Sequence, residues 1–177
     1  MTIHNEHPFL PPESERDPVR RLQGRLGGSV TLWTAESAAG ERAGLTVSSL
    51  LVAAGDPAHV LGLLDPESKF VEVLHETGVA VVQLLQWQHR NLADAFAGQF
   101  PAPGGAFKLA DWDATPYGPV LTDAAAWTSV RWVQASAHMV GWSLLVDCVV
   151  ERVEIRDESA PLIHRRGRYQ RPLVSEG

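Results

Sequence analysis

The chain has 177 residues, about the size of one ordinary domain, and its 45% of hydrophobic residues suffices for a sizeable core and excludes a disordered protein. Its formal net charge is −6, whereas a nucleic-acid-binding protein is expected to carry a basic surplus or stripe. The composition therefore predicts no nucleic-acid binding. No stretch of about 18 consecutive apolar residues is present, so the sequence predicts no membrane-spanning helix.

The N-terminal residues 1–20 are polar, acidic and rich in proline, which predicts a flexible arm or a segment that folds across a partner subunit. They lack the apolar stretch of a secretory signal peptide. Residues 21–177 are predicted to form a single domain. Their glycine-rich start, residues 24–28, matches neither the dinucleotide fingerprint nor the P-loop pattern, so we interpret it as a bend into the first strand.

Alternating and β-branched residues predict strands in the first third of the domain. Residues 29–34 form the first predicted strand, and residues 36–42 form a hairpin connection. The second predicted strand covers residues 45–52, and a short, fully apolar third strand covers residues 60–64.

Two short helices and further strands follow. Residues 66–75 show the i, i+3, i+4 spacing of an amphipathic helix, which ends at Gly78, and residues 89–97 predict a second helix. Apolar runs and alternation predict strands over 79–85, 126–134 and 142–155. About six strands with two inserted helices predict a β-barrel-centred α+β domain, because β-α-β alternation is not sustained.

A cluster of hydroxyl groups marks the second predicted strand. The segment Gly44-Leu45-Thr46-Val47-Ser48-Ser49-Leu50 carries three hydroxyls within four positions. Phosphate oxygens accept hydrogen bonds from hydroxyls and from backbone N–H groups exposed where a strand turns, so a phosphate is one candidate ligand. The alternative is a solvated strand edge or a Ser/Thr turn.

In this order the segments resemble the flavin reductase-like FMN-binding family, which has a split-barrel fold. The resemblance runs from about Arg20 to Tyr169, and it depends on six segments in the family's order rather than on one specific motif. The segments are residues 28–34; residues 44–50; Asp56-Pro57 with residues 60–63 and Ser68; Leu92-Ala93 with Phe96-Ala97-Gly98; Trp112 with Pro119-Val120-Leu121 and Ala124; and residues 161–164 with Gly167-Arg168-Tyr169.

The resemblance implies a mainly β, α+β split barrel of about six strands or more with short inserted helices. It implies a homodimer that binds FMN, or less often FAD, near the subunit interface. The implied activity is reduction of the flavin by NAD(P)H, often to supply a partner monooxygenase. No catalytic side chain is assigned, because the flavin itself carries the hydride chemistry.

The resemblance also implies which residues hold the flavin. The hydroxyls of Thr46, Ser48 and Ser49 would bind its phosphate, and the backbone N–H groups of Val47 and Leu50 would add donors.

Further candidates come from the next helix and strand. Ser68 and Lys69 would supply a hydroxyl and a positive charge at a helix start, although an exposed first turn is the alternative. Gln83 interrupts an apolar strand at a position where the family usually has Asn. Its amide would bind the flavin ring or pair with the backbone of a neighbouring strand, and both roles stay open.

The chain departs from the family at the Gly-Asp-His motif, whose histidine is often placed near the nicotinamide. Here the motif is Gly141-Trp142-Ser143, and His89 stands where the family often has Gln. Trp142 would stack on the cofactor or, in the commoner role, pack in the core or an interface. Two alternatives follow: a flavin-binding module without NAD(P)H turnover, and a split barrel with another cofactor, such as a deazaflavin or haem.

The remaining reactive residues predict little. Cys148 is the only cysteine, which excludes an intrachain disulfide and a thiolate-rich metal site and fits a reducing cytoplasm. The seven histidines show no paired metal-ligand spacing, so no metal site is predicted. A histidine and several arginines gather between His164 and Arg171, and we interpret this run as a solvated segment.

Overall fold

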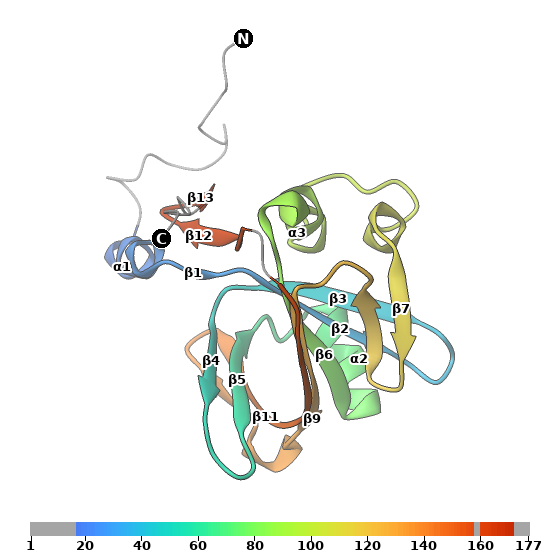
Figure 1. The fold of residues 1–177 in the computed structure, drawn as a ribbon. Helices are drawn as coiled ribbons and strands as arrows, with labels where there is room; N and C mark the ends of the chain where they lie inside the picture. The colour runs from blue at the N-terminus through green and yellow to red at the C-terminus, as the bar shows by residue number, and fades with distance from the viewer. Residues whose placement is uncertain (1–16, 158–159, 172–177) are drawn as a thin grey trace.

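The computed structural model describes residues 17–157 and 160–171, and Figure 1 shows the fold. The helices are α1 (Pro18–Leu26), α2 (Lys69–Thr77) and α3 (Arg90–Phe96), with short 3-10 helices η2 (Trp87–His89), η3 (Ala106–Leu109) and η4 (Gln134–Ser136). The strands are β1 (Gly28–Ser29), β2 (Thr31–Glu36), β3 (Arg42–Val47), β4 (Leu50–Ala53), β5 (His59–Leu64), β6 (Val79–Leu84), β7 (Trp112–Thr115), β8 (Gly118–Leu121), β9 (Ala126–Trp132), β10 (His138–Val140), β11 (Ser143–Ile155), β12 (Ile163–Arg165) and β13 (Arg168–Gln170).

An antiparallel sheet in the order β3-β2-β6-β9-β11-β5-β4, with β10 beside β11, forms the body of the domain. Its two outermost strands, β3 and β4, are consecutive in the chain and are joined only by Ser48 and Ser49. So short a connection spans about 10 Å. The sheet must therefore curl until its edges meet, which gives the predicted split barrel and places Ser48 and Ser49 at its seam (Figure 1).

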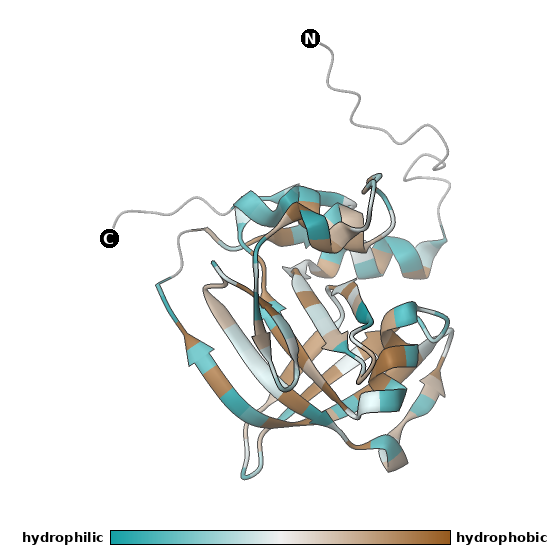
Figure 2. Cartoon of the chain, turned by 90° about the vertical axis from the view of Figure 1, so that its right-hand side faces the viewer, coloured by the Kyte–Doolittle hydropathy of each residue, from teal (hydrophilic) through white to brown (hydrophobic). Residues whose placement is uncertain are grey.

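Both faces of the central strands are buried, so the domain has two cores. On β2, Trp33 faces the first core and packs edge-on against Phe70 of α2, with ring centroids 6.1 Å apart. Leu32 on the same strand faces the second core, which α3, β8 and the C-terminal segment cover. Figure 2 shows the hydrophobic residues along the strands of the curled sheet. Adjacent residues of a strand thus face different cores, and this alternation with a period of two residues is the pattern that predicts strands from the sequence.

The fold class and the long strands predicted from sequence are confirmed, but two elements differ. The single strand predicted over residues 45–52 is wrong, because the chain bends at Ser48 and Ser49 and forms β3 and β4 instead. The first predicted helix begins at Lys69 rather than Pro66. Ser68 caps it by accepting a hydrogen bond from the Val71 N–H at 3.3 Å.

Helix α1 lies where the sequence analysis expected the end of the arm and a glycine bend. Asp17 caps it by accepting hydrogen bonds from the Val19 and Arg20 N–H groups, at 2.8 and 3.2 Å, and Pro18 occupies its first position. Residues 1–16 of the predicted arm lie outside the described residues. Among the helices of the described ranges, none has the length and apolar character needed to cross a membrane.

Candidate functional site

A cavity of about 700 Å³ lies where the barrel seam, α1 and the β12–β13 hairpin meet. Its volume falls within the range of about 300–1,000 Å³ that is usual for small-molecule sites. The seam contributes Ser48 and Ser49, and the other two segments contribute residues that include Gly27, Gly28 and His164.

The two ends of the chain form the cavity wall together. Strand β1 pairs with β12, with Gly28 opposite His164, and the Val30 N–H donates to the Leu162 carbonyl at 2.8 Å. The Arg166 N–H donates to the Gly24 carbonyl of α1 at 2.7 Å. The segment that the sequence analysis interpreted as a solvated tail is therefore built into the domain.

Two glycines line the cavity beside the seam. A Cβ atom on Gly28 would lie 3.1 Å from the Ser48 carbonyl oxygen, so the seam would have to move by a few tenths of an ångström to accept it. Gly27 ends α1 with a φ of +66°, a conformation that residues with a Cβ rarely adopt. These two glycines let β1 approach the seam closely.

The three predicted phosphate-binding hydroxyls do not share one role. The Thr46 Oγ1 donates to the Ala93 carbonyl of α3 at 2.7 Å, so it joins β3 to α3 and does not line the cavity. The Ser49 Oγ lines the cavity but donates to the Leu63 carbonyl at 2.7 Å. Ser48 is exposed, lines the cavity and has no hydrogen-bond partner for its hydroxyl in residues 17–157 and 160–171. The expectation that all three hydroxyls face one ligand is therefore corrected.

The segment's two apolar residues belong to the first core. Val47 is buried, and its carbonyl accepts a hydrogen bond from the Thr31 hydroxyl at 2.6 Å. Leu50 packs against the same core. The Val47 side chain is therefore not available to a ligand, whereas the Leu50 side chain is only partly buried.

The opposite side of the cavity is basic. Arg20, Arg21 and Arg166 line it. The Nε of Arg21 is buried and has no hydrogen-bond partner within the described part of the chain. Burial lowers the pKa of His164, and the negative charge of Asp94, which acts in the opposite direction, offsets this only in part. Its imidazole is therefore neutral at pH 7. Hydroxyl and guanidinium donors around one cavity are the groups that bind phosphate oxygens.

Ser68 and Lys69 do not line this cavity. The Ser68 Oγ caps α2 and donates to the Asp65 carbonyl at 2.8 Å. The Lys69 ammonium pairs with Glu72 at 2.8 Å and with Glu41 at 3.2 Å, and these two carboxylates raise its pKa. Their role in binding a phosphate stays a prediction.

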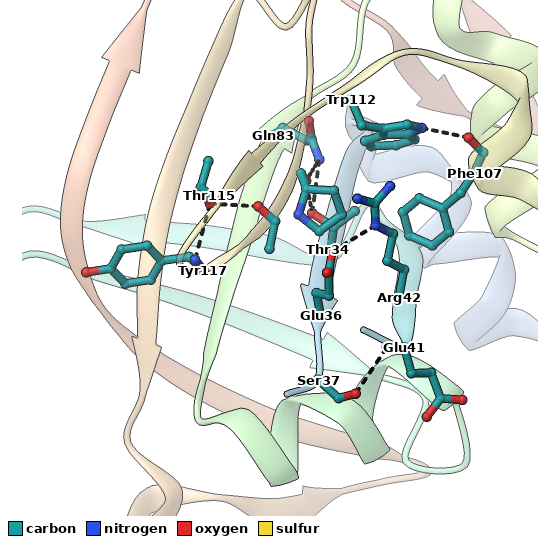
Figure 3. Close-up of polar contacts among 12 residues, drawn as sticks. Thr34, Glu36, Ser37, Glu41, Arg42, Gln83, Phe107, Trp112, Thr115 and Tyr117 are labelled. Carbon is teal, nitrogen blue, oxygen red and sulfur yellow. Dashed lines mark hydrogen bonds and ion pairs between the residues drawn. The ribbon is translucent and has the colours of Figure 1, made fainter. Parts of the chain in front are cut away.

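Gln83 is fully buried between β2 and β8 (Figure 3). Its Nε2 donates to the Thr34 hydroxyl at 3.2 Å and to the Pro119 carbonyl at 3.4 Å, and its Oε1 accepts from the Leu121 N–H at 2.8 Å. Of the two roles left open from the sequence, the structure supports pairing with a neighbouring strand, because no polar atom of the amide faces the cavity.

Trp142 does not pack in the core. Its side chain is 87% exposed, in the turn between β10 and β11, where Gly141 has a φ of +59°. Met139 and Val140 of β10, and Leu51 and Leu63 on β4 and β5, are exposed as well. An apolar surface on these neighbouring strands is typical of an interaction site.

His89 anchors the start of α3. Its Nδ1 accepts a hydrogen bond from the Gln86 N–H at 3.1 Å, so its Nε2 carries the proton and donates to the Asp123 carboxylate at 3.0 Å. The pair borders a second cavity of about 660 Å³. The buried histidine, which stands where the resembled family often has Gln, thus fixes the loop between β8 and β9.

The basic side of the main cavity could not be predicted from the sequence. The arginines of residues 20–21 and 165–168 were visible as charge runs, but they lie more than 140 residues apart in the sequence. Only the pairing of β1 with β12 brings them together.

Comparison with known proteins agrees with this architecture. The flavin reductase like domain matches residues 23–172. The FMN reductase (NADH) RutF of Variovorax paradoxus is 30% identical over 160 residues, which cover 90% of this chain and 87% of that protein.

Solved structures share the fold. The styrene monooxygenase flavin reductase of Pseudomonas putida S12 has a TM-score of 0.77 at 20% identity, with 90% of this chain and 99% of that chain covered. The NADH:FAD oxidoreductase SgcE6 of Streptomyces globisporus C-1027 has a TM-score of 0.79 at 20% identity, with 94% and 98% covered. From the extent of the domain match and the sequence identity to RutF, the chain belongs to the flavin reductase like domain family.

Proposed function

We propose that this chain is an FMN reductase that uses NADH to reduce flavin bound at the barrel seam. The observation that carries the proposal is the cavity at the barrel seam, where the Ser48 hydroxyl has no hydrogen-bond partner among the described residues. The relatives of similar length are named FMN reductase (NADH), which supports both the flavin and the nicotinamide substrate.

The residues of the cavity fit a flavin phosphate. Ser48 would donate its hydroxyl, and the backbone N–H group of Leu50, where the sheet edge turns, would add a donor, whereas the Val47 N–H faces Thr31 in the β2–β3 ladder. The absence of a side chain on Gly28 leaves room beside the Ser48 carbonyl. FAD is the alternative flavin, because the cavity continues past the seam to α1.

The chain's own residues position and shield the reactants. A bound flavin supplies the hydride acceptor and later the reducing equivalents for a second molecule. The neutral imidazole of His164 and the exposed hydroxyl of Ser48 orient ligands without adding a titrating charge near pH 7. Ser68 and Lys69 would join them only if Lys69 exchanged Glu41 and Glu72 for the phosphate.

The active form is a homodimer in this proposal. The exposed apolar side chains of Leu51, Leu63 and Val140 on one face of the sheet, with Trp142 in the adjoining turn, form a surface that a second copy would cover, and Trp142 would then pack in an interface. The lone, buried Cys148 supports a cytoplasmic location, where thiols stay reduced.

We further propose that the reduced flavin supplies a monooxygenase. One solved structure that shares the fold is named as the flavin reductase of a styrene monooxygenase. The cavity lies at the surface between three segments of the chain, which would give the reduced flavin a route out to a partner.

The test is anaerobic titration of the purified protein with NADH in the presence of FMN. We expect FMN to raise the melting temperature, and NADH to bleach the flavin with a turnover of about 1 per second or more. Binding of FMN without NADH oxidation would favour the flavin-binding module suggested by Gly141-Trp142-Ser143. No binding of FMN at all would reject the proposal.

A further inference from the structure

Basic residues are concentrated on one face of this acidic protein. Seven of the 15 lysine and arginine residues fall in residues 18–27 and 160–171, which contain no acidic residue, although the whole chain has a net charge of −6. They are Arg20, Arg21, Arg25, Arg165, Arg166, Arg168 and Arg171. The rest of the chain is therefore strongly acidic.

The fold places these two segments side by side. The Arg166 N–H donates to the Gly24 carbonyl at 2.7 Å, and the Arg165 guanidinium donates to the Arg25 carbonyl at 3.3 Å. Helix α1 and the β12–β13 hairpin, which lie beside β1 in Figure 1, thus bring these arginines to one arginine-rich face. Below, this is called the arginine face.

We propose that the three arginines of this face that line the cavity, Arg20, Arg21 and Arg166, bind the phosphates of the nicotinamide dinucleotide and hold it against the flavin at Ser48 and Ser49. The inference rests on the proposed function and assigns a site to its second substrate. Arg20, Arg21 and Arg166 line the same cavity as the two serines. An anion bound by these arginines therefore lies within one cavity of the seam.

Three observations favour a small dinucleotide over a larger polyanion. The face is continuous with a cavity of about 700 Å³ rather than with a flat stripe. The buried Nε of Arg21 lacks a partner among the described residues, and a ligand oxygen would satisfy it. The acidic remainder of the surface repels an anionic dinucleotide elsewhere and directs it to this face.

The charges of the two ligands indicate which groups of the cavity bind each of them. One flavin phosphate is served by the hydroxyl and backbone donors of the seam. A dinucleotide adds a pyrophosphate, for which guanidinium groups are the suited, bidentate partners. Because it must bind and leave in every turnover, a solvent-exposed cationic site suits it better than a buried one.

The experiment measures binding of ADP-ribose, which carries the pyrophosphate but no nicotinamide, by calorimetry in the absence of flavin. The variant is the double substitution Arg20→Gln and Arg166→Gln. The matched control is Arg25→Gln, which removes a charge from the same helix at a residue that does not line the cavity. If the double variant does not fold, Arg20→Glu replaces it, because Arg20 is exposed on α1.

We expect the double variant to weaken ADP-ribose binding and to raise the KM for NADH about tenfold or more, whereas Arg25→Gln changes either by less than about threefold. The Kd for FMN should stay within about twofold of the wild type. Higher salt should weaken ADP-ribose binding in the wild type more than in the double variant.

Equal ADP-ribose affinity in the wild type and the double variant would overturn the inference, as would no binding by the wild type. A loss confined to FMN would also overturn it, because the arginines would then hold the flavin. Arginine-dependent ADP-ribose binding in a protein that does not bind FMN would support the site while rejecting the proposed function.

Discussion

The Tyr169 hydroxyl donates a hydrogen bond to the Asp94 Oδ1 at 2.8 Å, between residues 75 positions apart. It joins β13 to α3, and the His164 ring packs edge-on against the Tyr169 ring with centroids 5.8 Å apart. The C-terminal hairpin forms one wall of the cavity, so this hydrogen bond attaches that wall to the body of the domain.

Replacing Tyr169 with Phe should destabilise the protein by about 1–3 kcal/mol, because it removes a partly buried hydrogen bond to a carboxylate. Urea unfolding measures the change. Tyr117→Phe is the matched control, since the Tyr117 hydroxyl also donates to a carboxylate, that of Glu151, at the surface. We expect a loss below about 1 kcal/mol there. Equal losses would contradict the structural role of Tyr169.

The same contact predicts a pH dependence. Burial and the Asp94 carboxylate raise the pKa of Tyr169, so the folded chain holds this proton more tightly than the unfolded chain, whose tyrosines ionise near about pH 10. Its contribution to stability is complete below about pH 10 and is lost as the pH rises further. Above that pH, the stability of the wild type should fall more steeply than that of Tyr169→Phe.

The hydroxyls of Ser48 and Thr46 should differ in their effects on FMN binding and on stability. Ser48→Ala should raise the Kd for FMN about tenfold with little change in stability, because the Ser48 hydroxyl is exposed and has no hydrogen-bond partner among the described residues. Thr46→Val should cost about 1 kcal/mol of stability, through loss of its hydrogen bond to Ala93, and leave the Kd unchanged. Flavin fluorescence and urea unfolding measure the two quantities. The reverse pattern would show that Thr46 faces the flavin.

Gln83 should behave as a structural residue. Gln83→Leu leaves the Leu121 N–H and the Pro119 carbonyl without their amide partner and should cost about 2–4 kcal/mol. The control is Gln88→Leu, which removes an exposed amide that bonds Asp123 and should cost less than about 1 kcal/mol. Thermal unfolding tests both. A stable Gln83→Leu variant that had lost FMN binding would assign the amide to the flavin instead.

How much of this was visible in the sequence differs from element to element. Trp33 and Leu32 illustrate the successful part, because alternation on β2 predicts a strand whichever core each residue joins. The break at Ser48 and Ser49 could not be read in the same way. It depends on β3 and β4 lying at opposite edges of a curled sheet, which is a property of the whole topology.

Two other elements were not predicted, for different reasons. The start of helix α1 is visible in the sequence, since Asp17 followed by Pro18 is a typical helix start, but the glycines that follow favour a bend instead of a helix. Strand β8 was not predicted, because Pro119 is unusual inside a strand. That strand covers Gln83, so missing it left the role of the amide open.

The proposed dimer surface can be tested with one charge. Leu51 is 70% exposed on β4, and Leu51→Glu should shift the protein toward the monomer by placing a carboxylate in the apolar interface. Light scattering during size-exclusion chromatography measures the mass. Val153→Glu, at an exposed position near the far end of β11, is the control and should leave the mass unchanged. A wild-type protein that is monomeric at all concentrations would reject the dimer.

The most direct test of the account is a crystal structure of the protein grown with excess FMN. We predict that the flavin phosphate lies within hydrogen-bond distance of the Ser48 hydroxyl, inside the cavity between the seam, α1 and the β12–β13 hairpin. Flavin bound away from Ser48, or a seam that stays empty at saturating FMN, would contradict it.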